Sequence, residues 1–386
     1  MEEKKGVKQL PYGRQFIDDD DINAVIATLK SDWLTTGPKV DEFEKAICDY
    51  TGAKYAVAVN SGTSALDIAV AAFGLPAGSE IITTPFSFAA SANCIAYNGC
   101  RPVFADIDPK TYNIDPEQVR KKITKKTKAI IYVDYAGQPC DIKALQEIAE
   151  EKNLFLIEDA AHALGAKYNG KKIGTFAHMT EFSFHPVKHI TTGEGGAITT
   201  DDGALADKLR MLRNHGLDKS ARERFGPDAG YAYDMRMLGR NYRITDMQCA
   251  LGISQMKKLD RFIKGRRELV AAYGRELATL PLAMPYVAPN VESAWHLYTV
   301  QLGRGISRDK VFAAMRKRGV GVNVHYIPTY KFTYYKKNFP ANDSDYPATE
   351  DVFSHILTLP LFYGMKEADV QWVAKELSES IREAGQ

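Results

Sequence analysis

The chain has 386 residues, 45% of them hydrophobic, and its 50 basic and 48 acidic side chains give a formal net charge of +2. This length exceeds the roughly 250–300 residues at which single hydrophobic cores stop growing, so two domains are expected. The near-neutral balance excludes the broad positive field of nucleic-acid-binding proteins, although a local basic patch could still hold a diphosphate.

The cysteines indicate neither a disulfide framework nor a zinc site, because they are odd in number and include no Cys-x-x-Cys pair. They are Cys48, Cys94, Cys100, Cys140 and Cys249. No metal is therefore predicted. The first ten residues lack the apolar core of a signal peptide, and no stretch stays apolar for the ~20 residues of a membrane span. These features predict a soluble, cytoplasmic protein that does not act at a membrane.

From about residue 50, short apolar runs alternate with helical patterns. The strand-like runs are 55–59, 80–83, 102–105, 128–133, 154–158, 180–184 and 196–199. The helical patterns are 62–74, 88–97, 115–122, 141–151 and 202–213. Such alternation predicts an α/β fold in which helices cover both faces of a mostly parallel, seven-stranded sheet.

After residue 245 the pattern changes. One long helical stretch is predicted from Asp246 to about Leu280, with its charged residues on the outer face. It would connect the large domain to a smaller C-terminal α+β domain, with strands near 297–302 and 320–324.

The domain prediction has two parts. Residues 1–250 would form the N-terminal segment and the large domain, and residues 251–386 the linking helix and the small domain. Residues 218–240 lack clean periodicity and contain turn residues. They are interpreted either as a surface excursion near the active site or as an ordinary loop.

The run from Tyr55 to Leu66 combines a short apolar strand, a turn of small residues and a helix. Unpaired amides at the helix N-terminus, those of Gly62, Thr63 and Ser64, would form an anion site at the positive end of the dipole. Taken alone, Gly-Thr-Ser could equally begin an ordinary helix.

Asp159 ends a buried apolar strand over residues 153–159. The carboxyl ends of strands are where open α/β sheets bind ligands. A pyridine-containing cofactor at this point would pair its ring nitrogen with Asp159, and the protonated ring would then accept electrons. The alternative is a helix N-cap, a position that aspartate also favours.

Lys188 follows an apolar strand and precedes a glycine-rich turn, in the segment 183–196. Pro186, Val187 and Ile190 flank it, so its ammonium group is predicted to be partly desolvated. Desolvation lowers the pKa of an ammonium group, and a neutral amine condenses with an aldehyde. By itself the residue could also be a structural surface lysine.

Phosphate loop, strand-end aspartate and desolvated lysine, in this order, imply pyridoxal 5′-phosphate (PLP). Eight motifs then carry a resemblance. They are Asn60–Leu66, Thr84–Ala89, Val103–Ile107, Glu158–Gly165, Phe182–Lys188, Gly193–Gly196, Asn241–Thr245 and Val324–Pro328. The chain resembles PLP enzymes of the aspartate-aminotransferase fold, and among them the sugar-nucleotide aminotransferases of the DegT/StrS type, over nearly its whole length.

The resemblance implies four roles near the cofactor ring. Lys188 would tether the cofactor and then move the substrate proton as general base and acid, and Asp159 would hold the ring nitrogen. His162, predicted one helical turn further on, would lie against the ring or its hydroxyl, or else be an ordinary helix-side histidine. Phe86 would stack on the ring face, with core packing as its alternative.

The resemblance also implies a phosphate site that two subunits share. The phosphate would be held by three amides and one hydroxyl, those of Gly62, Thr63, Ser64 and Ser183. The family adds an asparagine from the neighbouring subunit, which Asn241 matches, so an obligate homodimer is expected. Arg240 departs from the family, where an aromatic residue or histidine is more usual, and this puts the local loop conformation in doubt.

The substrate would be contacted by two groups of residues. They are Tyr12, Trp33, Leu34 and Thr35 at the entrance, and His325, Tyr326 and Pro328 on a turn from the small domain. The alternative for the entrance segment is a rigid surface loop. Segments 133–139 and 183–196 most resemble enzymes that aminate UDP-4-keto-6-deoxy-N-acetyl-hexoses in the pseudaminic acid pathway. The residues alone predict only PLP-dependent transamination of a carbonyl sugar, with L-glutamate as the amino donor that the resemblance implies.

Three other functions stay open. The amination could occur at a 3-keto or 4-keto position of another UDP- or dTDP-sugar. A PLP-dependent sugar dehydratase shares this fold, but the resembling members carry histidine where this chain has Lys188. A regulator without catalytic activity would be expected to lose Asp159, Lys188 or the phosphate loop, and all three are present.

Overall fold

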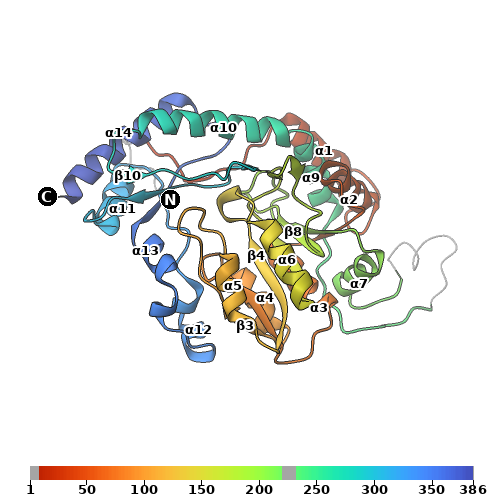
Figure 1. Ribbon diagram of the computed structural model, residues 1–386. Coiled ribbons are helices and arrows are strands. Elements are labelled where there is room, and N and C mark those ends of the chain that lie inside the picture. Colours follow the sequence, from red (N-terminus) through yellow and green to blue (C-terminus); the bar gives the residue numbers. More distant parts are fainter. Residues whose placement is uncertain (1–7, 220–231, 386) are drawn as a thin grey trace.

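The computed structural model describes residues 8–219 and 232–385 (Figure 1). Residues 220–231 of the predicted excursion at 218–240 lie outside these ranges. The large-domain strands are β1 (Tyr55–Val59), β2 (Glu80–Thr83), β3 (Arg101–Phe104), β4 (Thr127–Val133), β5 (Phe155–Asp159), β8 (Met179–Ser183) and β9 (Gly196–Thr200). The early helices are α1 (Asp19–Leu29), α2 (Pro38–Thr51), α3 (Gly62–Ala72), α4 (Ala90–Tyr97), α5 (Pro116–Lys122), α6 (Ile142–Lys152) and α7 (Gly203–Arg213).

The later part of the chain is mostly helical. Its helices are α9 (Asp246–Met256), α10 (Leu259–Glu276), α11 (Arg308–Lys317), α12 (Thr333–Asn338), α13 (Pro347–His355) and α14 (Glu367–Ala384). The remaining strands are β6 (Lys167–Tyr168), β7 (Lys171–Lys172), β10 (Leu282–Ala283), β11 (Val291–Glu292), β12 (Tyr298–Leu302) and β13 (Ile356–Leu359). Short 3₁₀ turns lie at Tyr135–Gly137, Thr329–Lys331 and Asp343–Asp345. Among the helices of the described ranges, none is long and apolar enough to cross a bilayer.

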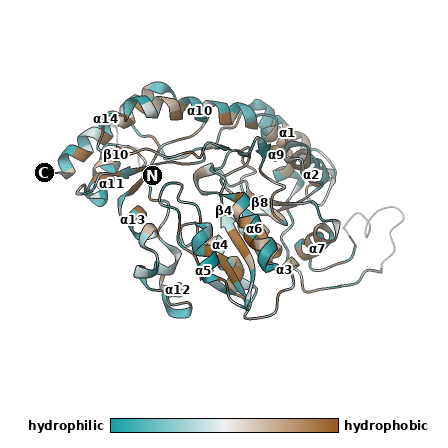
Figure 2. Cartoon of the chain, in the orientation of Figure 1, coloured by the Kyte–Doolittle hydropathy of each residue, from teal (hydrophilic) through white to brown (hydrophobic). Residues whose placement is uncertain are grey.

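Seven strands form the main sheet in the order β1-β9-β8-β5-β4-β2-β3. Only β9 runs antiparallel to its neighbours, and the other adjacent pairs are parallel. The predicted seven-stranded, mostly parallel sheet is confirmed. Most of its strand residues are buried, and the strands beside α4 and α6 are brown in Figure 2, as expected when both faces of a sheet are covered.

Alternating strand residues face two separate cores. Ala56 and Ala58 of β1 belong to a cluster that includes residues of α2, α6 and α9. Val57 and Val59 face the opposite side and pack with residues of α3, α4 and α7. Because side chains alternate along a strand, this division places helices on both faces of the sheet, as predicted.

The single helix predicted for 246–280 is wrong, because α9 and α10 are separated at Lys257 and Lys258. Lys258 is buried, and its ammonium group lies 2.9 Å from a carboxylate oxygen of Asp21 and also contacts Asp18. This ion pair with the start of α1 holds the chain at the break. No glycine or proline marks the position, so the helical pattern in the sequence is continuous.

α10 does connect the two parts of the molecule, and Figure 1 shows it spanning from α1 and α9 toward α14. Phe262 and Ile263 pack in the core of the main sheet, whereas Leu269 and Tyr273 pack in the second core, around β12 and β13. Leu10 of the N-terminal segment also belongs to this second core. The domain boundary between residues 250 and 251, which falls inside α9, stays a prediction.

The small sheet has the order β10-β12-β13, so the strand predicted near 297–302 is confirmed and the strand at 320–324 is wrong. Val320 and Asn323 form isolated bridges to Leu10 and Thr358 respectively. Since the segment contacts two different partners, no continuous ladder develops. The strand beside β12 is instead β13, which follows α13 without a break.

Candidate active site

The predicted cofactor residues gather at the carboxyl edge of the main sheet. Asp159 is the last residue of β5, Ser183 is the last residue of β8, and the turn after β1 leads into α3. Lys188 lies in the turn that follows β8, where its backbone N–H donates to the His185 carbonyl at 2.9 Å. A Cβ atom built on Gly62 would lie 3.2 Å from the Ser183 hydroxyl, so the turn and β8 are in direct contact.

The anion site at the start of α3 has two free amides rather than three. The Ser61 hydroxyl caps the helix and accepts a hydrogen bond from the Ser64 amide at 3.1 Å. The prediction of a free Ser64 amide is therefore wrong, because the cap uses it. In the described chain, the amides of Gly62 and Thr63 and the Ser183 hydroxyl make no hydrogen bond, so they remain available to an anion.

Asp159 is buried, and the strand that it ends is followed by a turn rather than by a helix. One carboxylate oxygen accepts from the Ser91 hydroxyl at 2.6 Å, and the other accepts from the Ala161 amide at 3.2 Å. The N-cap alternative is excluded, because residues 161–165 form turns. A carboxylate has about four acceptor positions, so Asp159 can still bind a protonated ring nitrogen.

His162 lies in the same turn and not on the helix that was predicted for it. Its Nδ1 accepts from the Ala136 amide at 3.3 Å, so the proton of the neutral ring is on Nε2 and points to the Tyr326 hydroxyl at 3.1 Å. Burial holds the pKa of His162 well below its usual value, and the charge of Lys188 adds to this effect. The imidazole is therefore neutral.

The prediction for Phe86 needs correction, and its core-packing alternative is supported. Phe86 has 0% of its surface exposed and packs with Ile107 and Tyr135, so neither ring face is open to a cofactor. Phe88, two residues later, is 64% exposed, and its ring centre lies 6.3 Å from that of Tyr326. Phe88 is thus the better candidate for stacking on a bound ring.

We predict that substitution of the two phenylalanines affects different properties, PLP binding for Phe88 and stability for Phe86. Phe88→Ala should weaken PLP binding by roughly 3- to 10-fold, from the ~0.5–1.5 kcal/mol of an aromatic stack, with little loss of stability. Phe86→Ala should lower the free energy of unfolding by about 3–5 kcal/mol because it leaves a core cavity. Fluorescence titration with PLP and urea unfolding measure both quantities. Unchanged PLP affinity in Phe88→Ala would assign the ring contact to another residue.

Lys188 has the chemical character that its flanking residues predict. Burial lowers the pKa of Lys188 to about 8, while the carboxyl groups of Glu181 and Asp159 raise it. Within the described chain, no ion pair joins Lys188 to either carboxyl group. A substantial fraction of the amine is therefore neutral near pH 8 and can attack an aldehyde.

The covalent capture of PLP by the apoenzyme should depend on this ionisation. Only the neutral amine reacts, so the rate should rise about tenfold per pH unit below pH 8 and level off above it. Stopped-flow absorbance between pH 6 and 10 follows the reaction. A midpoint near 10.5, the ordinary lysine value, would show that Lys188 is not desolvated.

One group of predicted substrate residues lies beside the cofactor residues. The Tyr12 and His325 rings are 5.4 Å apart, and Tyr326 contacts His162 through the hydrogen bond described above. The Tyr135 hydroxyl donates to the His325 carbonyl at 2.5 Å and so attaches this turn to the large domain. Pro328, in the same turn, is buried and therefore shapes the backbone rather than offering a contact surface.

The other group lies beside the start of α9. Thr35 forms a bridge with Thr245, and the Leu34 carbonyl accepts from the amide of Asp246 at 3.1 Å. Trp33 and Leu34 are 40% and 46% exposed. No described hydrogen bond or ring contact joins this group to Tyr12 or Tyr326 of the same chain.

Asn241 is exposed and forms a bridge with Asn214, and it precedes in sequence the Thr245 that bridges to Thr35. Arg240, the residue that departs from the family, forms an ion pair with the buried Asp67 of α3 at 3.2 Å. The Tyr242 hydroxyl donates to the same carboxylate at 2.9 Å, and the Tyr242 carbonyl accepts from the Asn60 amide. The loop is thus fixed on both sides of Asn241, which removes the doubt about its conformation.

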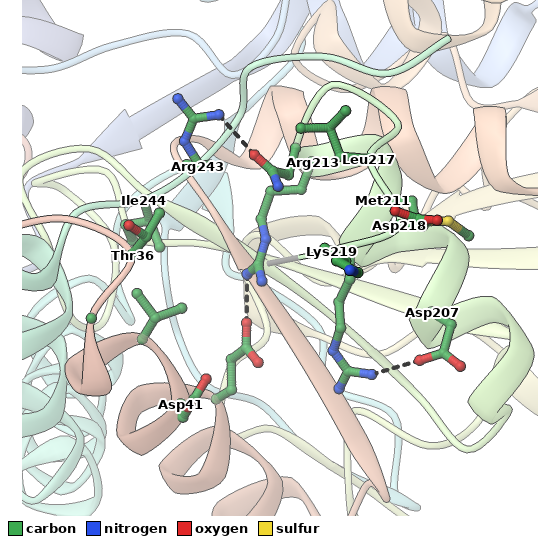
Figure 3. Close-up of a pocket in the computed structure, with 15 residues that line it drawn as sticks. Thr36, Asp41, Asp207, Met211, Arg213, Leu217, Asp218, Lys219, Arg243 and Ile244 are labelled. Atoms are coloured by element: carbon green, nitrogen blue, oxygen red, sulfur yellow. Dashed lines mark hydrogen bonds and ion pairs between the residues drawn. The ribbon is translucent and has the colours of Figure 1, made fainter. Parts of the chain in front are cut away.

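A cavity of about 620 Å³ lies between α2, α7 and the segment before α9 (Figure 3). Its charged groups pair with their neighbours: Arg213 with Glu44 at 2.6 Å, and Arg243 with Asn214 at 2.9 Å. The predicted cofactor residues of the described chain do not line it. Hydrogen-bond geometry and residue chemistry, not cavity size, therefore define the candidate active site.

The residues fit PLP. The free amides and the free hydroxyl can bind the phosphate. The carboxylate of Asp159 and the desolvated Lys188 lie at the same edge of the sheet. The site also contains Glu181 of β8, which sequence reasoning missed. Glu181 is 1% exposed, and within the described chain neither of its carboxyl oxygens accepts a hydrogen bond from a donor group. Its position two residues before Ser183, on the same face of the strand, could have revealed it.

Comparison with known proteins gives three similar examples. The Bacillus subtilis spore coat polysaccharide biosynthesis protein SpsC is 40% identical over 380 residues, covering 97% of this chain and 98% of SpsC. Helicobacter pylori PseC, an aminotransferase involved in pseudoaminic acid biosynthesis, has a TM-score of 0.92 and 33% identity over 97% of this chain and 100% of PseC. Streptococcus pneumoniae Spr1654 in its PMP form has a TM-score of 0.92 and 30% identity, with 97% and 100% coverage.

These structures confirm the predicted fold. Spr1654 is known in a PLP form as well, with a TM-score of 0.91 and 29% identity over 98% of this chain and 100% of that one. Residues 15–378 match the model of one enzyme family. The predicted enzyme class and cofactor are confirmed with it, because the chain belongs to the DegT/DnrJ/EryC1/StrS aminotransferase family, whose enzymes depend on PLP.

Proposed function

We propose that this aminotransferase transfers the amino group of L-glutamate to a nucleotide-activated keto-deoxy sugar in the cytoplasm. The observation that carries the proposal is the arrangement of Lys188, Asp159 and the free amides of α3 beside the aromatic residues Tyr12 and Tyr326. An aromatic rim next to a cofactor site suits a sugar or a nucleotide base, because both present flat apolar faces.

PLP, when bound, carries the amino group and withdraws electrons from the substrate carbon through its ring. Lys188 Nζ would take the proton from that carbon of the amino donor and would later supply a proton to the carbonyl carbon of the keto sugar, as general base and acid. The Asp159 carboxylate would keep the ring nitrogen protonated, and Gly62, Thr63 and Ser183 would hold the phosphate. The neutral His162 would orient the Tyr326 hydroxyl, to which it is hydrogen-bonded.

The substrate we favour is a UDP-6-deoxy-N-acetyl-hexose with a 4-keto group, as in a pseudaminic acid type pathway. The product would be UDP-4-amino-4,6-dideoxy-N-acetyl-β-L-altrosamine. Support comes from the segment 183–196, which most resembles that subgroup, and from the likeness to PseC. Lys188 disfavours a dehydratase, since the resembling dehydratases have histidine at this position.

A product assay tests this function. Purified enzyme is incubated with L-glutamate and a panel of UDP- and dTDP-linked 3-keto and 4-keto sugars, and the products are identified by mass spectrometry and NMR. We expect amination at C4 of the UDP-N-acetyl sugar. Preferential amination of a dTDP-sugar would correct the substrate, release of a dehydrated sugar would identify a dehydratase, and no turnover with any sugar would contradict the proposal.

We also propose a homodimer in which Asn241 of one subunit binds the phosphate in the site of the other. Asn241 is exposed on a fixed loop, and the exposed Trp33 and Leu34 lie on the nearby segment before α2. In a dimer, this second group of residues would line the entrance to the partner's site. Shared sites would explain why the two groups do not meet within one chain.

Mixing two inactive variants tests the shared site. In a heterodimer of Asn241→Asp and Lys188→Ala chains, shared sites put both lesions into one site and none into the other. Activity should therefore recover toward half of wild type per heterodimer, since the introduced carboxylate repels phosphate only in the doubly altered site. If Asn241 acts within its own subunit, each site keeps one lesion and activity stays absent, with heterodimers verified by native mass spectrometry.

A further inference from the structure

The side chain of Glu181 places a second carboxyl group beside that of Asp159. β5 and β8 are parallel neighbours, and Asp159 and Glu181 are directly paired in their register. Paired residues of adjacent strands point to the same face, so the two carboxyl groups lie side by side. A Cβ atom built on Gly62 would fall 2.4 Å from a Glu181 oxygen, which places the carboxyl group under the first turn of α3.

The surroundings of Glu181 contain both opposing and supporting charges. The titratable groups that face it are Asp159 from β5, Lys188 from the turn after β8, and Cys94 from α4. Lys188 and the positive end of α3 favour the ionised carboxylate. Burial, followed by the adjacent Asp159, opposes ionisation more strongly, so the pKa of Glu181 is well above its usual value.

The hydrogen bonds independently indicate that Glu181, and not Asp159, holds a proton. Asp159 already accepts from Ser91 and Ala161, as an ionised carboxylate does. Among the described residues none donates to Glu181, and burying a carboxylate without donors costs far more free energy than burying a neutral acid. If one of two adjacent carboxyl groups holds a proton, it is therefore the one that lacks donors, and the proton can only be shared with an acceptor beside it.

We propose that Glu181 is a positioning residue of the cofactor site, a neutral acid that donates a hydrogen bond to Asp159 and keeps that carboxylate directed at the ring nitrogen. The inference rests on the role proposed above for Asp159. It also keeps the charge at this point at minus one, so that no second anion opposes the phosphate held by the neighbouring Gly62 amide.

Unfolding of the apoenzyme at different pH values tests whether Glu181 holds its proton. When a carboxyl group has a raised pKa in the folded state, the free energy of unfolding falls as pH rises from the pKa of the unfolded state, near 4.5, to the pKa of the folded state. Glu181→Gln cannot lose a proton, so the ratio of wild-type to Glu181→Gln unfolding constants should rise about tenfold per pH unit above pH 5. Glu147→Gln is the control, because it removes an exposed carboxylate of α6 and should not change the pH dependence in this way.

PLP binding tests whether the hydrogen bond positions Asp159. Glu181→Gln can still donate to Asp159 and should bind PLP about as tightly as wild type, whereas Glu181→Leu cannot and should bind roughly tenfold or more weakly. A stability ratio that stays flat from pH 5 to 8.5 would overturn the proposal, as would equal affinities of the Leu variant and wild type or of the Leu and Gln variants. Should Glu181→Leu not fold, the pH series with Glu181→Gln decides alone. Neither measurement uses a sugar, so a failed keto-sugar assay would leave both readouts intact.

Discussion

Lys188→Ala is expected to lower the aminotransfer rate by about 10⁴-fold or more and to abolish covalent attachment of PLP. The general acid-base role alone contributes about 10²–10⁴-fold, and the variant loses the tether as well. The protein should still fold, because the Lys188 side chain makes no hydrogen bond or ion pair within the described chain. Borohydride reduction followed by mass spectrometry detects the covalent link, and amino-group transfer from L-glutamate measures the rate.

Two controls separate chemistry from folding. Lys143→Ala, in an exposed lysine of α6, should leave both readouts unchanged. A small primary amine such as ethylamine should partly restore turnover in Lys188→Ala, because it can enter the space left by the side chain and supply the missing base. Wild-type turnover by Lys188→Ala without added amine would show that the residue does not carry the reaction.

The main sheet could be predicted from the sequence because its strands are continuous apolar runs separated by regular helical patterns. The later part was harder to predict, because its element boundaries are not marked by the local sequence. The break between α9 and α10 depends on an ion pair between Lys258 and Asp21, which are far apart in the sequence. The strand β13 directly follows α13, without the turn residues that mark a strand boundary.

The candidate site also contains residues that the sequence could identify and residues that it could not. Asp159 and Lys188 could be identified because each has a chemical role tied to a strand end. Ser61 was missed because either it or Gly62 could begin α3, and only the observed cap distinguishes them. Phe86 and Phe88 differ in burial, which a sequence with two nearby aromatic residues does not reveal. The choice between them depends on the packing of Phe86 against Tyr135.

Asp159→Asn is expected to reduce turnover on the order of 10²–10³-fold, the effect of removing one preorganised electrostatic partner, while PLP binding weakens only modestly. Asparagine preserves the size of the side chain but cannot carry the charge that keeps a ring nitrogen protonated. One of its two present donors, Ser91 or the Ala161 amide, must also lose its acceptor, because the amide group has a single oxygen. Rates of amino-group transfer and PLP titrations measure the two effects.

Ser91→Ala is the matched control for this substitution. It removes one hydrogen bond from Asp159 but leaves the charge, so turnover should fall far less than in Asp159→Asn. Asparagine has nearly the same shape as aspartate and keeps one acceptor oxygen, so a purely structural role would leave Asp159→Asn nearly active. Equal losses in Ser91→Ala and Asp159→Asn would attribute the effect to side-chain orientation rather than to charge. A large loss in Asp159→Asn alone, at unchanged stability, requires a negative charge at the end of β5, where a protonated pyridine would bind.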